Sequence, residues 1–378
     1  MEYAHGGDIY TYKGMLDFSV NVNPLGPSER VIDAAKRGAE RAMEYPDSRC
    51  GRLREALSGK KGIPTERIIA GNGAAELFFS LVLAERPRTA VIPVPAFSEY
   101  EQALKTVDCE VREYFLKKEN NFRLTEDFLN ELSPETDIVF LCSPSNPAGQ
   151  AIDRELLSKI ADRCEGYGIR LVVDECFIDF LAEPEDYTME RMTEQYSCLF
   201  VVQAFTKIHA IPGLRLGYGI TSDEALLERM QQVRQPWSVS IPAQEAGIAA
   251  LGDVERVCAA RELTGRERMR MEKKLSGSGV EVVPSQANFI LMHSPYDLFR
   301  LLKDRGILIR DCSNYSGLGR GWYRTAVRRS EENDRLLEAV RQICQEEKRR
   351  SQCQDSQANL EQMKKCRKDK ERQEEYSG

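Results

Sequence analysis

Long apolar segments are missing from this sequence. No run approaches the ~18 consecutive apolar residues that a membrane-spanning helix requires. The first residues, MEYAHGGD, also lack the charged and then apolar pattern of a secretory signal. We therefore expect a cytoplasmic protein with no membrane partner.

Closely spaced cysteines are also missing, although the chain contains 11 cysteines. No two stand at the short spacing of a zinc site, and a cytoplasmic chain is not expected to carry a disulfide framework. Several lie in apolar stretches, such as Cys142 in IVFLCS and Cys198 in CLFVV, where a thiol behaves as a small apolar side chain. The sequence predicts no metal site.

An excess of positive charge is missing as well, because the formal net charge at pH 7 is -7. This balance disfavours a general nucleic-acid binder, although a local basic pocket for a small anion is compatible with it. Apolar residues make up 42% and charged residues 30%, as in an ordinary globular protein. Because single cores stop growing near ~250–300 residues, the 378 residues suit one large domain and a smaller one.

The order of apolar and amphipathic segments predicts an α/β fold. Residues 1–27 are rich in Gly, Asn and Pro and are expected to form an extended arm with turns rather than a packed element. Residues 28–250 alternate short apolar runs with longer amphipathic ones, which indicates a large domain with a mostly parallel sheet flanked by helices. The strands are predicted at 67–70, 89–94, 137–142, 169–174, 198–202 and 214–220.

The remainder of the chain predicts a second unit and a tail. Residues 251–345 are expected to form a smaller α+β domain, with strands in EVVPSQANFILM, GILIRDC and YRTAVR and a helix at 295–305. Residues 346–378 are rich in Lys, Arg, Glu and Gln. This charged tail is expected to be either a frayed helix or disordered.

Four predicted strands end in residues that could contact a ligand, because ligands of open α/β sheets lie at the carboxyl ends of strands. After the strand at 67–70, free backbone N–H groups of Gly73, Ala74 and Ala75 could cradle a phosphate, or the segment could be a plain strand-to-helix turn. After the strand at 137–142, Asn146 lies between Pro144 and Pro147, which stiffen the loop. Its amide could bind a ligand or simply shape the turn.

Asp174 and Lys207 follow two further apolar strands. A carboxylate at the end of such a strand needs a cationic partner, which a ligand or a structural ion pair would supply equally well. A lysine in a partly dry site becomes a nucleophilic amine, whereas an exposed structural lysine does not. Arg215, eight residues after Lys207, offers a basic anchor. Together and in this order, the residues at these four strand ends and Arg215 favour a cofactor site more strongly than any one of them does alone.

The motifs GNGAAE, SPSNPAG, VVDE and TK…PGLRLGY resemble those of the fold-type I pyridoxal-phosphate (PLP) enzymes, close to the histidinol-phosphate aminotransferase group. The resemblance spans residues 5–345 and implies the PLP-dependent transferase fold and PLP as the cofactor. It implies that Lys207 forms the Schiff base with the cofactor. It also implies that Asp174 keeps the pyridine nitrogen protonated, which makes the ring an electron sink.

The same resemblance implies the remaining cofactor contacts. Asn146 would contact the ring hydroxyl, and Phe97 in PAFSEY would stack on the ring. The phosphate would be bound by Gly73, Ala74, Ala75, Thr206 and Arg215, and by Tyr45 of the YPD motif from the partner subunit of a homodimer.

Two positions depart from the pattern of the group. Phe177 stands where these enzymes usually have Tyr, and Ala204 stands where they usually have Ser. Both changes weaken single cofactor contacts, but neither removes the amine or the carboxylate.

The two ends of the chain show a narrower resemblance, to the threonine-phosphate decarboxylases of the cobalamin pathway. It is carried by HGGD at 5–8, DFSVNVNPLGP at 17–27 and IRDCSNYSGLGRGWYRTAVR at 309–328. It implies that Arg324 binds the substrate α-carboxylate and that Arg310 binds its phosphate or carboxylate. The substrate contacts expected beside these arginines are His5, Asn23 and Asn146, with His5 and Asn23 placed at the phosphate. A disordered N-terminal histidine is the alternative for His5.

The expected reaction is the decarboxylation of L-threonine O-3-phosphate to (R)-1-aminopropan-2-yl phosphate and CO2. Transamination of histidinol phosphate is the alternative, because the bond that breaks depends on whether the arginines hold the carboxylate out of the ring plane or in it. Serine phosphate is a third possibility, since one methyl group is worth only ~1–3 kcal/mol of discrimination. A regulator that binds PLP without turnover is disfavoured, because the sequence contains no helix-turn-helix pattern.

Overall fold

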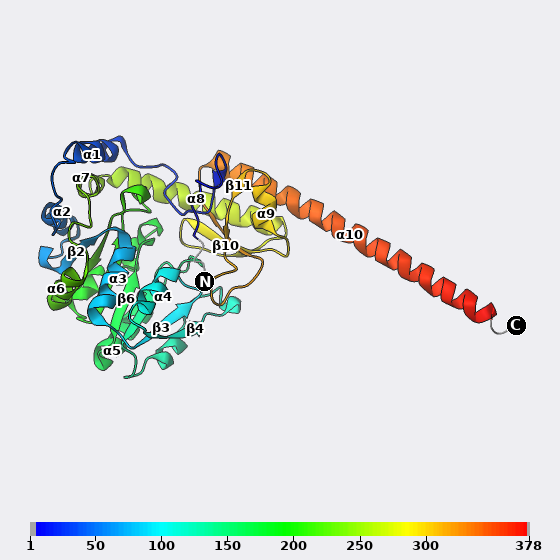
Figure 1. Cartoon of the computed structure of the whole chain (residues 1–378), viewed down its shortest axis with the longest axis horizontal. Helices are drawn as coiled ribbons and strands as arrows, with labels where there is room; N and C mark the ends of the chain where they lie inside the picture. The colour runs from blue at the N-terminus through cyan, green and yellow to red at the C-terminus, as the bar shows by residue number, and fades with distance from the viewer. Residues whose placement is uncertain (1–4, 376–378) are drawn as a thin grey trace.

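The computed structural model of the chain describes residues 5–375, with the backbone alone for residues 353–361 and 363–375. A large sheet covered by helices lies next to a smaller sheet, and one long helix extends from this body (Figure 1). None of the described helices combines the length and the apolar character needed to cross a bilayer.

A seven-stranded sheet with the order β2-β8-β7-β6-β5-β3-β4 forms the centre of the larger part. Strands β7, β6, β5, β3 and β4 are mutually parallel, whereas β8 is antiparallel to both β7 and β2. This confirms the predicted α/β fold with a mostly parallel sheet. The strand bounds are β2 Ile68–Gly71, β3 Thr89–Val94, β4 Glu110–Phe115, β5 Ile138–Cys142, β6 Arg170–Asp174, β7 Leu199–Ala204 and β8 Gly217–Ile220.

Strand β4 is absent from the sequence prediction. It lies at the edge of the sheet, and none of its residues is fully buried. It carries Glu110, Arg112 and Glu113, and charged side chains of this kind protect an open edge from pairing with other chains. Apolar runs therefore identified the six strands whose residues are mostly buried, including β2 at the other edge, and not this one.

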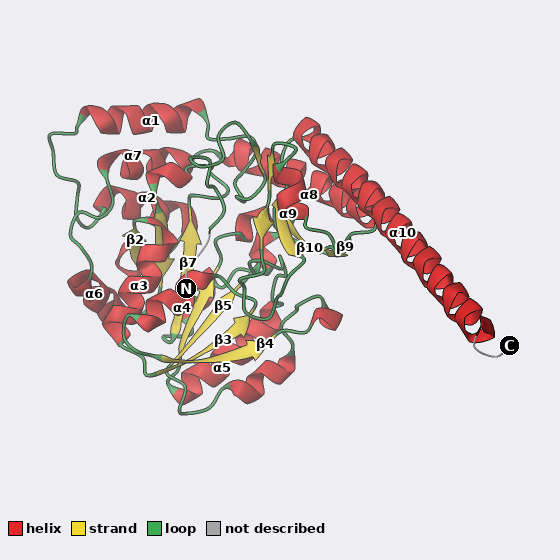
Figure 2. Ribbon diagram, turned by 45° about the vertical axis from the view of Figure 1, so that its right-hand side comes forward, coloured by secondary structure: helices red, strands yellow, loops and turns green. Residues whose placement is uncertain are grey.

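Helices cover both faces of the large sheet (Figure 2). Alternate residues of a strand point to opposite faces, so Val172 of β6 packs with helices α3, α4 and α6, whereas Leu171 and Val173 pack with α5. The helix bounds are α1 Glu29–Glu40, α2 Gly51–Lys61, α3 Gly73–Glu85, α4 Ser98–Lys105, α5 Arg154–Tyr167, α6 Glu224–Val233 and α7 Ile241–Ala250. Short 3-10 helices lie at Thr65–Arg67, Lys118–Asn120, Glu126–Glu131, Ile178–Phe180, Pro184–Asp186, Glu190–Glu194 and Pro212–Leu214.

The smaller part contains an antiparallel sheet with the order β12-β13-β10-β9. Its core is formed together with helices α8, α9 and α10, for example by Met271, Ile290 and Val340. The bounds are β9 Glu281–Val283, β10 Phe289–His293, β12 Arg310–Asp311, β13 Trp322–Ala326, α8 Val254–Gly277, α9 Leu298–Lys303 and α10 Ser330–Glu375.

The N-terminal segment is packed more firmly than its composition suggested. Strand β1, Leu16–Asp17, pairs in parallel with β11, Ile307–Leu308. Phe18 is fully buried in the core of the smaller part. Gly and Pro indicated the turns of this segment correctly but carry no information about burial, so the expectation of an arm without a packed element was wrong.

Helix α10 crosses the predicted boundary between residues 345 and 346 without a break. Of its described side chains, the last buried one belongs to Cys344. The side chains of residues 345–352 are exposed or half-buried, and the helix leaves the body of the protein in this region (Figure 1).

Candidate active site

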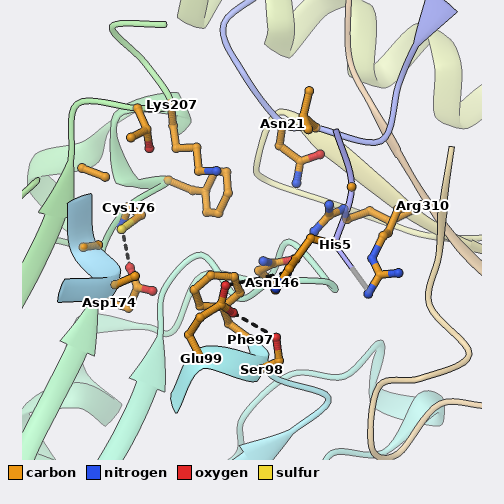
Figure 3. A pocket seen from close by; sticks show the side chains of 18 of the residues that line it. His5, Asn21, Phe97, Ser98, Glu99, Asn146, Asp174, Cys176, Lys207 and Arg310 are labelled. Carbon is orange, nitrogen blue, oxygen red and sulfur yellow. Dashed lines mark hydrogen bonds and ion pairs between the residues drawn. The ribbon is translucent and has the colours of Figure 1, made fainter. Parts of the chain in front are cut away.

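A cavity of about 260 Å³ lies at the carboxyl ends of β5, β6 and β7, next to the smaller sheet and the N-terminal segment (Figure 3). Ligands of α/β sheets bind at such an edge. Most of the residues singled out from the sequence meet here. The predicted residues that line the cavity are His5, Ala74, Ala75, Phe97, Asn146, Asp174, Thr206, Lys207, Arg215, Arg310 and Arg324.

Asp174 ends strand β6 and is held by two donors. Tyr100 donates its hydroxyl hydrogen to Oδ2 at 2.5 Å, and the Cys176 backbone N–H donates to Oδ1 at 2.9 Å. Burial raises the pKa of Asp174, while hydrogen bonds from the side chain and backbone of Cys176 and from Tyr100, together with the charge of Lys207, counteract the shift. Both carboxylate oxygens are therefore fixed at the floor of the cavity, ready to face a cationic ligand group.

Lys207 follows strand β7 and extends into the same cavity (Figure 3). Burial lowers the pKa of Lys207, and the neighbouring Arg324 and Arg215 lower it further against the opposing effect of Cys176 and Asp174. Its Nζ lies 5.4 Å from the centroid of the Phe177 ring. Among the described residues no acceptor binds this amine, so it is available for chemistry.

The start of helix α3 faces Arg215. Gly73 has φ +77, and a Cβ atom on it would lie 2.6 Å from Arg215 Nη2. A Cβ on Gly217 of β8 would lie 2.6 Å from the backbone nitrogen of Ala74. Only glycines allow this approach, which brings a guanidinium group next to free N–H groups at a helix N-terminus. Such an arrangement binds phosphate.

Arg324 of β13 is buried and bound by oxygen atoms of three residues from two segments. It donates from Nη2 to the Ser19 carbonyl oxygen at 3.0 Å and from Nη1 to Asn146 Oδ1. The Asn21 amide, with its oxygen turned towards the arginine, accepts from Nε at 3.2 Å and from Nη1 at 3.3 Å. All these partners are neutral, so the positive charge of Arg324 has no counterion among the described residues.

Arg310 of β12 is the second buried arginine of the cavity. It donates to Asn314 Oδ1 at 2.9 Å, and its guanidinium carbon lies 5.4 Å from the centroid of the Tyr315 ring. It too forms no ion pair with a carboxylate in the described part of the chain. Two buried, unpaired guanidinium groups in one cavity indicate a site for an anion.

His5 lies at the mouth of the cavity on the N-terminal segment. Its Nδ1 is 3.7 Å from Glu99 Oε1 on helix α4. The histidine is about half exposed, whereas Glu99 is largely buried. The structure places this half-exposed histidine at the cavity, and its contact with a substrate is still a prediction. Glu99 was not among the residues predicted from the sequence.

Three predicted residues do not line the cavity. Gly73 stands behind Ala74 and Ala75, where it makes room for Arg215. Tyr45 is 78% exposed and stacks on Trp237, with ring centroids 4.7 Å apart. Its assignment to the site of a partner subunit is still a prediction.

Asn23 is the third of these, and it has a structural position instead. Its Nδ2 donates to the Ile208 carbonyl oxygen at 2.8 Å, and its Oδ1 accepts from the Leu25 N–H at 2.9 Å. Asn21, two residues earlier, lines the cavity in its place. The signal was present in the sequence, because an Asn before a Pro favours a turn in which its side chain bonds the backbone two residues on.

Comparison with known proteins agrees with the geometry of the cavity. Residues 13–340 match the family described as aminotransferase class I and II. The chain belongs to this family. It is 38% identical to the threonine-phosphate decarboxylase of Salmonella typhimurium over 352 residues, which cover 90% of this chain and 96% of that protein.

Aminotransferases of the same family are also similar. The histidinol-phosphate aminotransferase 2 of Archaeoglobus fulgidus is 34% identical over 88% of this chain and 94% of its own length. The crystal structure of histidinol-phosphate aminotransferase from Sinorhizobium meliloti, in complex with pyridoxal 5'-phosphate, superimposes with a TM-score of 0.81 at 20% identity, covering 92% of this chain and 96% of that one. The chain is a PLP-dependent enzyme with the fold of these proteins.

The residues of the cavity fit PLP. Arg215 and the start of α3 would bind the phosphate, and the fixed carboxylate of Asp174 would bind the ring nitrogen. The unpartnered amine of Lys207 would bind the aldehyde carbon, and Phe97 and Asn146 line the space between these ends. When bound, PLP supplies an electron sink for a bond broken at the substrate Cα.

Proposed function

We propose that the enzyme decarboxylates L-threonine O-3-phosphate to (R)-1-aminopropan-2-yl phosphate and CO2, a reaction of cobalamin biosynthesis. The observation that carries the proposal is the pair of buried arginines, Arg310 and Arg324, neither of which has a carboxylate partner in the described part of the chain. A cofactor phosphate at Arg215 leaves both free for the substrate. Threonine phosphate offers two anionic groups, a carboxylate and a phosphate, for these two cations.

Arg324 is the better candidate for the substrate carboxylate. It bonds Asn146, which lies in the part of the cavity that fits the cofactor ring, and reacting bonds lie next to that ring. Ser19 and Asn21 fix its guanidinium group from the other side. A guanidinium that cannot turn sets the direction of the carboxylate it binds, and this direction decides which bond at Cα is broken.

Arg310 and His5 are then left for the substrate phosphate. Both line the cavity away from the Asp174 floor, on the smaller sheet and the N-terminal segment (Figure 3). Arginine suits a phosphate because its planar fork donates two parallel hydrogen bonds. After loss of CO2 the Cα atom needs a proton, and the Lys207 amine is the buried group whose lowered pKa suits proton transfer.

We also propose that the enzyme acts as a homodimer. Tyr45, Trp237 and Met43 are exposed, and Tyr45 stacks on Trp237 outside the cavity of its own subunit. Trp237 precedes Ser238, whose carbonyl oxygen accepts a hydrogen bond from Asn72 directly before helix α3. Exposed aromatic side chains next to the end of the cavity that would bind the cofactor phosphate favour a second subunit that covers them. Sedimentation of the native protein measures its oligomeric state.

Transamination of histidinol phosphate is the second candidate, and the 34% identity to an aminotransferase of that name supports it. The two reactions are separated by incubating the purified holoenzyme with threonine phosphate, and separately with histidinol phosphate and 2-oxoglutarate. The proposal expects CO2 in the first incubation and no glutamate in the second. Glutamate formation without CO2 release would contradict it, and a parallel incubation with serine phosphate measures the contribution of the substrate methyl group.

A further inference from the structure

Glu99 is an unusual residue in the wall of this cavity. Apart from Asp174 it contributes the one carboxylate among the described lining residues, and its side chain is only 16% exposed. The proposed substrate carries a carboxylate and a phosphate. A buried carboxylate beside such an anion repels it unless a cation lies between them.

A basic side chain, that of His5, stands beside this carboxylate. Glu99 Oε1 lies 3.7 Å from His5 Nδ1, an ion-pair separation longer than a hydrogen bond. The other oxygen, Oε2, accepts a hydrogen bond from Ser98 Oγ at 2.9 Å, so the carboxylate is held in one orientation at the start of helix α4 (Figure 3). Burial raises the pKa of Glu99, and the nearby His5 is the largest influence in the opposite direction.

His5 belongs to a segment that is attached at a second point, on the other side of the cavity. The Gly7 N–H donates to Ser19 Oγ at 2.7 Å, and a Cβ on Gly6 would lie 2.4 Å from the Ser19 carbonyl oxygen. That same carbonyl oxygen accepts a hydrogen bond from Arg324. The segment 5–7 therefore runs from the arginine side of the cavity to helix α4, and Glu99 provides its contact with the helix.

We propose that Glu99 is a positioning residue that holds His5 over the cavity, so that the imidazole ring binds the phosphate of the substrate. This inference rests on the proposed function, in which His5 contacts that phosphate. Because Nδ1 faces Glu99, Nε2 is the ring nitrogen left for the substrate. The bond made by one ring nitrogen fixes the orientation of the other.

The experiment is a double-mutant cycle with Glu99→Gln and His5→Ala in the holoenzyme. With His5 present, Glu99→Gln should raise KM for threonine phosphate about two- to fivefold, the range of a partly exposed ion pair, with kcat changed less. In the His5→Ala background the same change should leave KM unaltered or lower it, because Glu99 without His5 only repels the phosphate. An equal rise of KM in both backgrounds would overturn the inference.

A second measurement is independent of turnover. Hydrogen exchange of peptides that include residues 5–20, measured without substrate, should be faster in Glu99→Gln than in the wild type. The matched control is Glu101→Gln on the same helix, because Glu101 pairs with Lys105 at 2.6 Å and does not line this cavity. Equal exchange in the two variants would also overturn the inference.

The two measurements separate this inference from the proposed function. If histidinol phosphate proves to be the substrate, the proposed function fails, but the cycle can be run on that substrate because it also carries a phosphate. If the effects of Glu99→Gln and His5→Ala on KM are additive, the role assigned to Glu99 is wrong. Unchanged hydrogen exchange in the N-terminal segment of Glu99→Gln would contradict it as well.

Discussion

The Tyr100 hydroxyl donates a 2.5 Å hydrogen bond to Asp174, and this bond joins a helix to the end of a strand of the large sheet. Asp174 ends strand β6, whereas Tyr100 lies on helix α4 after β3. The Tyr100 ring stacks on Phe140 at 5.1 Å and is 1% exposed, so the position of its hydroxyl oxygen is fixed by the packing of the ring. The carboxylate that is to face the cofactor is thus oriented by the packing of an aromatic core.

Replacement of Tyr100 by Phe should destabilise the cofactor-free protein. The ring and its packing stay, while the buried Asp174 carboxylate loses one of its two donors. We expect the free energy of unfolding, measured in urea without PLP, to fall by about 1.5–3 kcal/mol, the range for hydrogen bonds to charged groups. Tyr323→Phe is the control, because that hydroxyl donates to the neutral carbonyl oxygen of Tyr296 at 3.2 Å. A loss no larger than in the control would contradict the prediction.

Lys207→Ala should abolish covalent attachment of the cofactor. Borohydride treatment of the holoenzyme followed by peptide mass spectrometry should find PLP on Lys207 in the wild type and on no lysine in the variant. Turnover should fall by at least about 10²–10⁴-fold, the contribution of a positioned proton-transfer group. The exposed Lys36 on helix α1 gives a control substitution that should leave both results unchanged. Labelling of another lysine in the wild type would refute the assignment.

The sequence located the chemistry that stands at the ends of buried strands. Asp174, Lys207 and Asn146 follow apolar runs, and parallel strands bring such ends to one edge of a sheet. Tyr100 and Glu99 lie on a helix, where nothing in the local pattern shows which side chain faces a cavity formed by distant segments.

Asn21 shows a similar limit on the N-terminal segment. The turn position of Asn23 is indicated by the following Pro24, whereas no local pattern shows that the buried Asn21 faces Arg324. The edge strand β4 was missed because its polar side chains give no apolar run. Contacts that depend on burial against remote parts of the chain could not be predicted from local sequence patterns.

Arg310→Ala and Arg324→Ala should each lower kcat/KM for threonine phosphate about 10- to 150-fold, which corresponds to one charge-assisted contact of about 1.5–3 kcal/mol. Arg320→Ala on the connecting loop is an exposed control that should have no effect. Steady-state kinetics on the three variants measure these changes. If Arg324 binds the carboxylate, its variant should also divert part of the reaction, which is detected as keto product beside CO2. Normal kinetics in Arg310→Ala would rule out its assignment to the substrate.

Removal of residues 353–378 should leave the enzyme unaffected. Among the side chains of helix α10 that the structure describes, the last buried one is Cys344, and the ion pair of Glu346 with Arg305 at 2.8 Å is retained in the shortened chain. Surface changes away from packed residues usually alter the free energy of unfolding by less than about 0.5 kcal/mol. Thermal unfolding and kcat/KM of the two chains test this, and a clear loss in either would assign a role to the end of the helix.

A buried carboxylate next to the active site predicts a pH dependence of stability. Glu175 follows Asp174 and accepts hydrogen bonds from Thr188 Oγ1, the Met189 N–H and Gln203 Nε2 at 2.7, 2.6 and 3.0 Å. Burial, together with the charge of Glu190, raises the pKa of Glu175 to about 8. The native state therefore keeps a proton on Glu175 over a pH range in which the unfolded chain, with a pKa of about 4.3, has lost it.

The sign of the effect follows from proton linkage. Between about pH 4.3 and the native pKa, Glu175 binds more protons in the native state than in the unfolded state, so its contribution to the free energy of unfolding should fall as pH rises, by at most about 1.4 kcal/mol per pH unit. Glu175→Gln lacks this titration. The melting temperature of the variant minus that of the wild type should therefore increase from acidic to alkaline pH, whatever its value at the acidic end. Differential scanning calorimetry over this range, with the exposed Glu183→Gln as control, measures the difference. If the difference in melting temperature stays constant with pH, the pKa of Glu175 is the same in the native and unfolded states, because only a carboxylate with an unshifted pKa gives parallel curves of melting temperature against pH. Glu175 would then already be ionised in the native protein at acidic pH, and the prediction would be wrong.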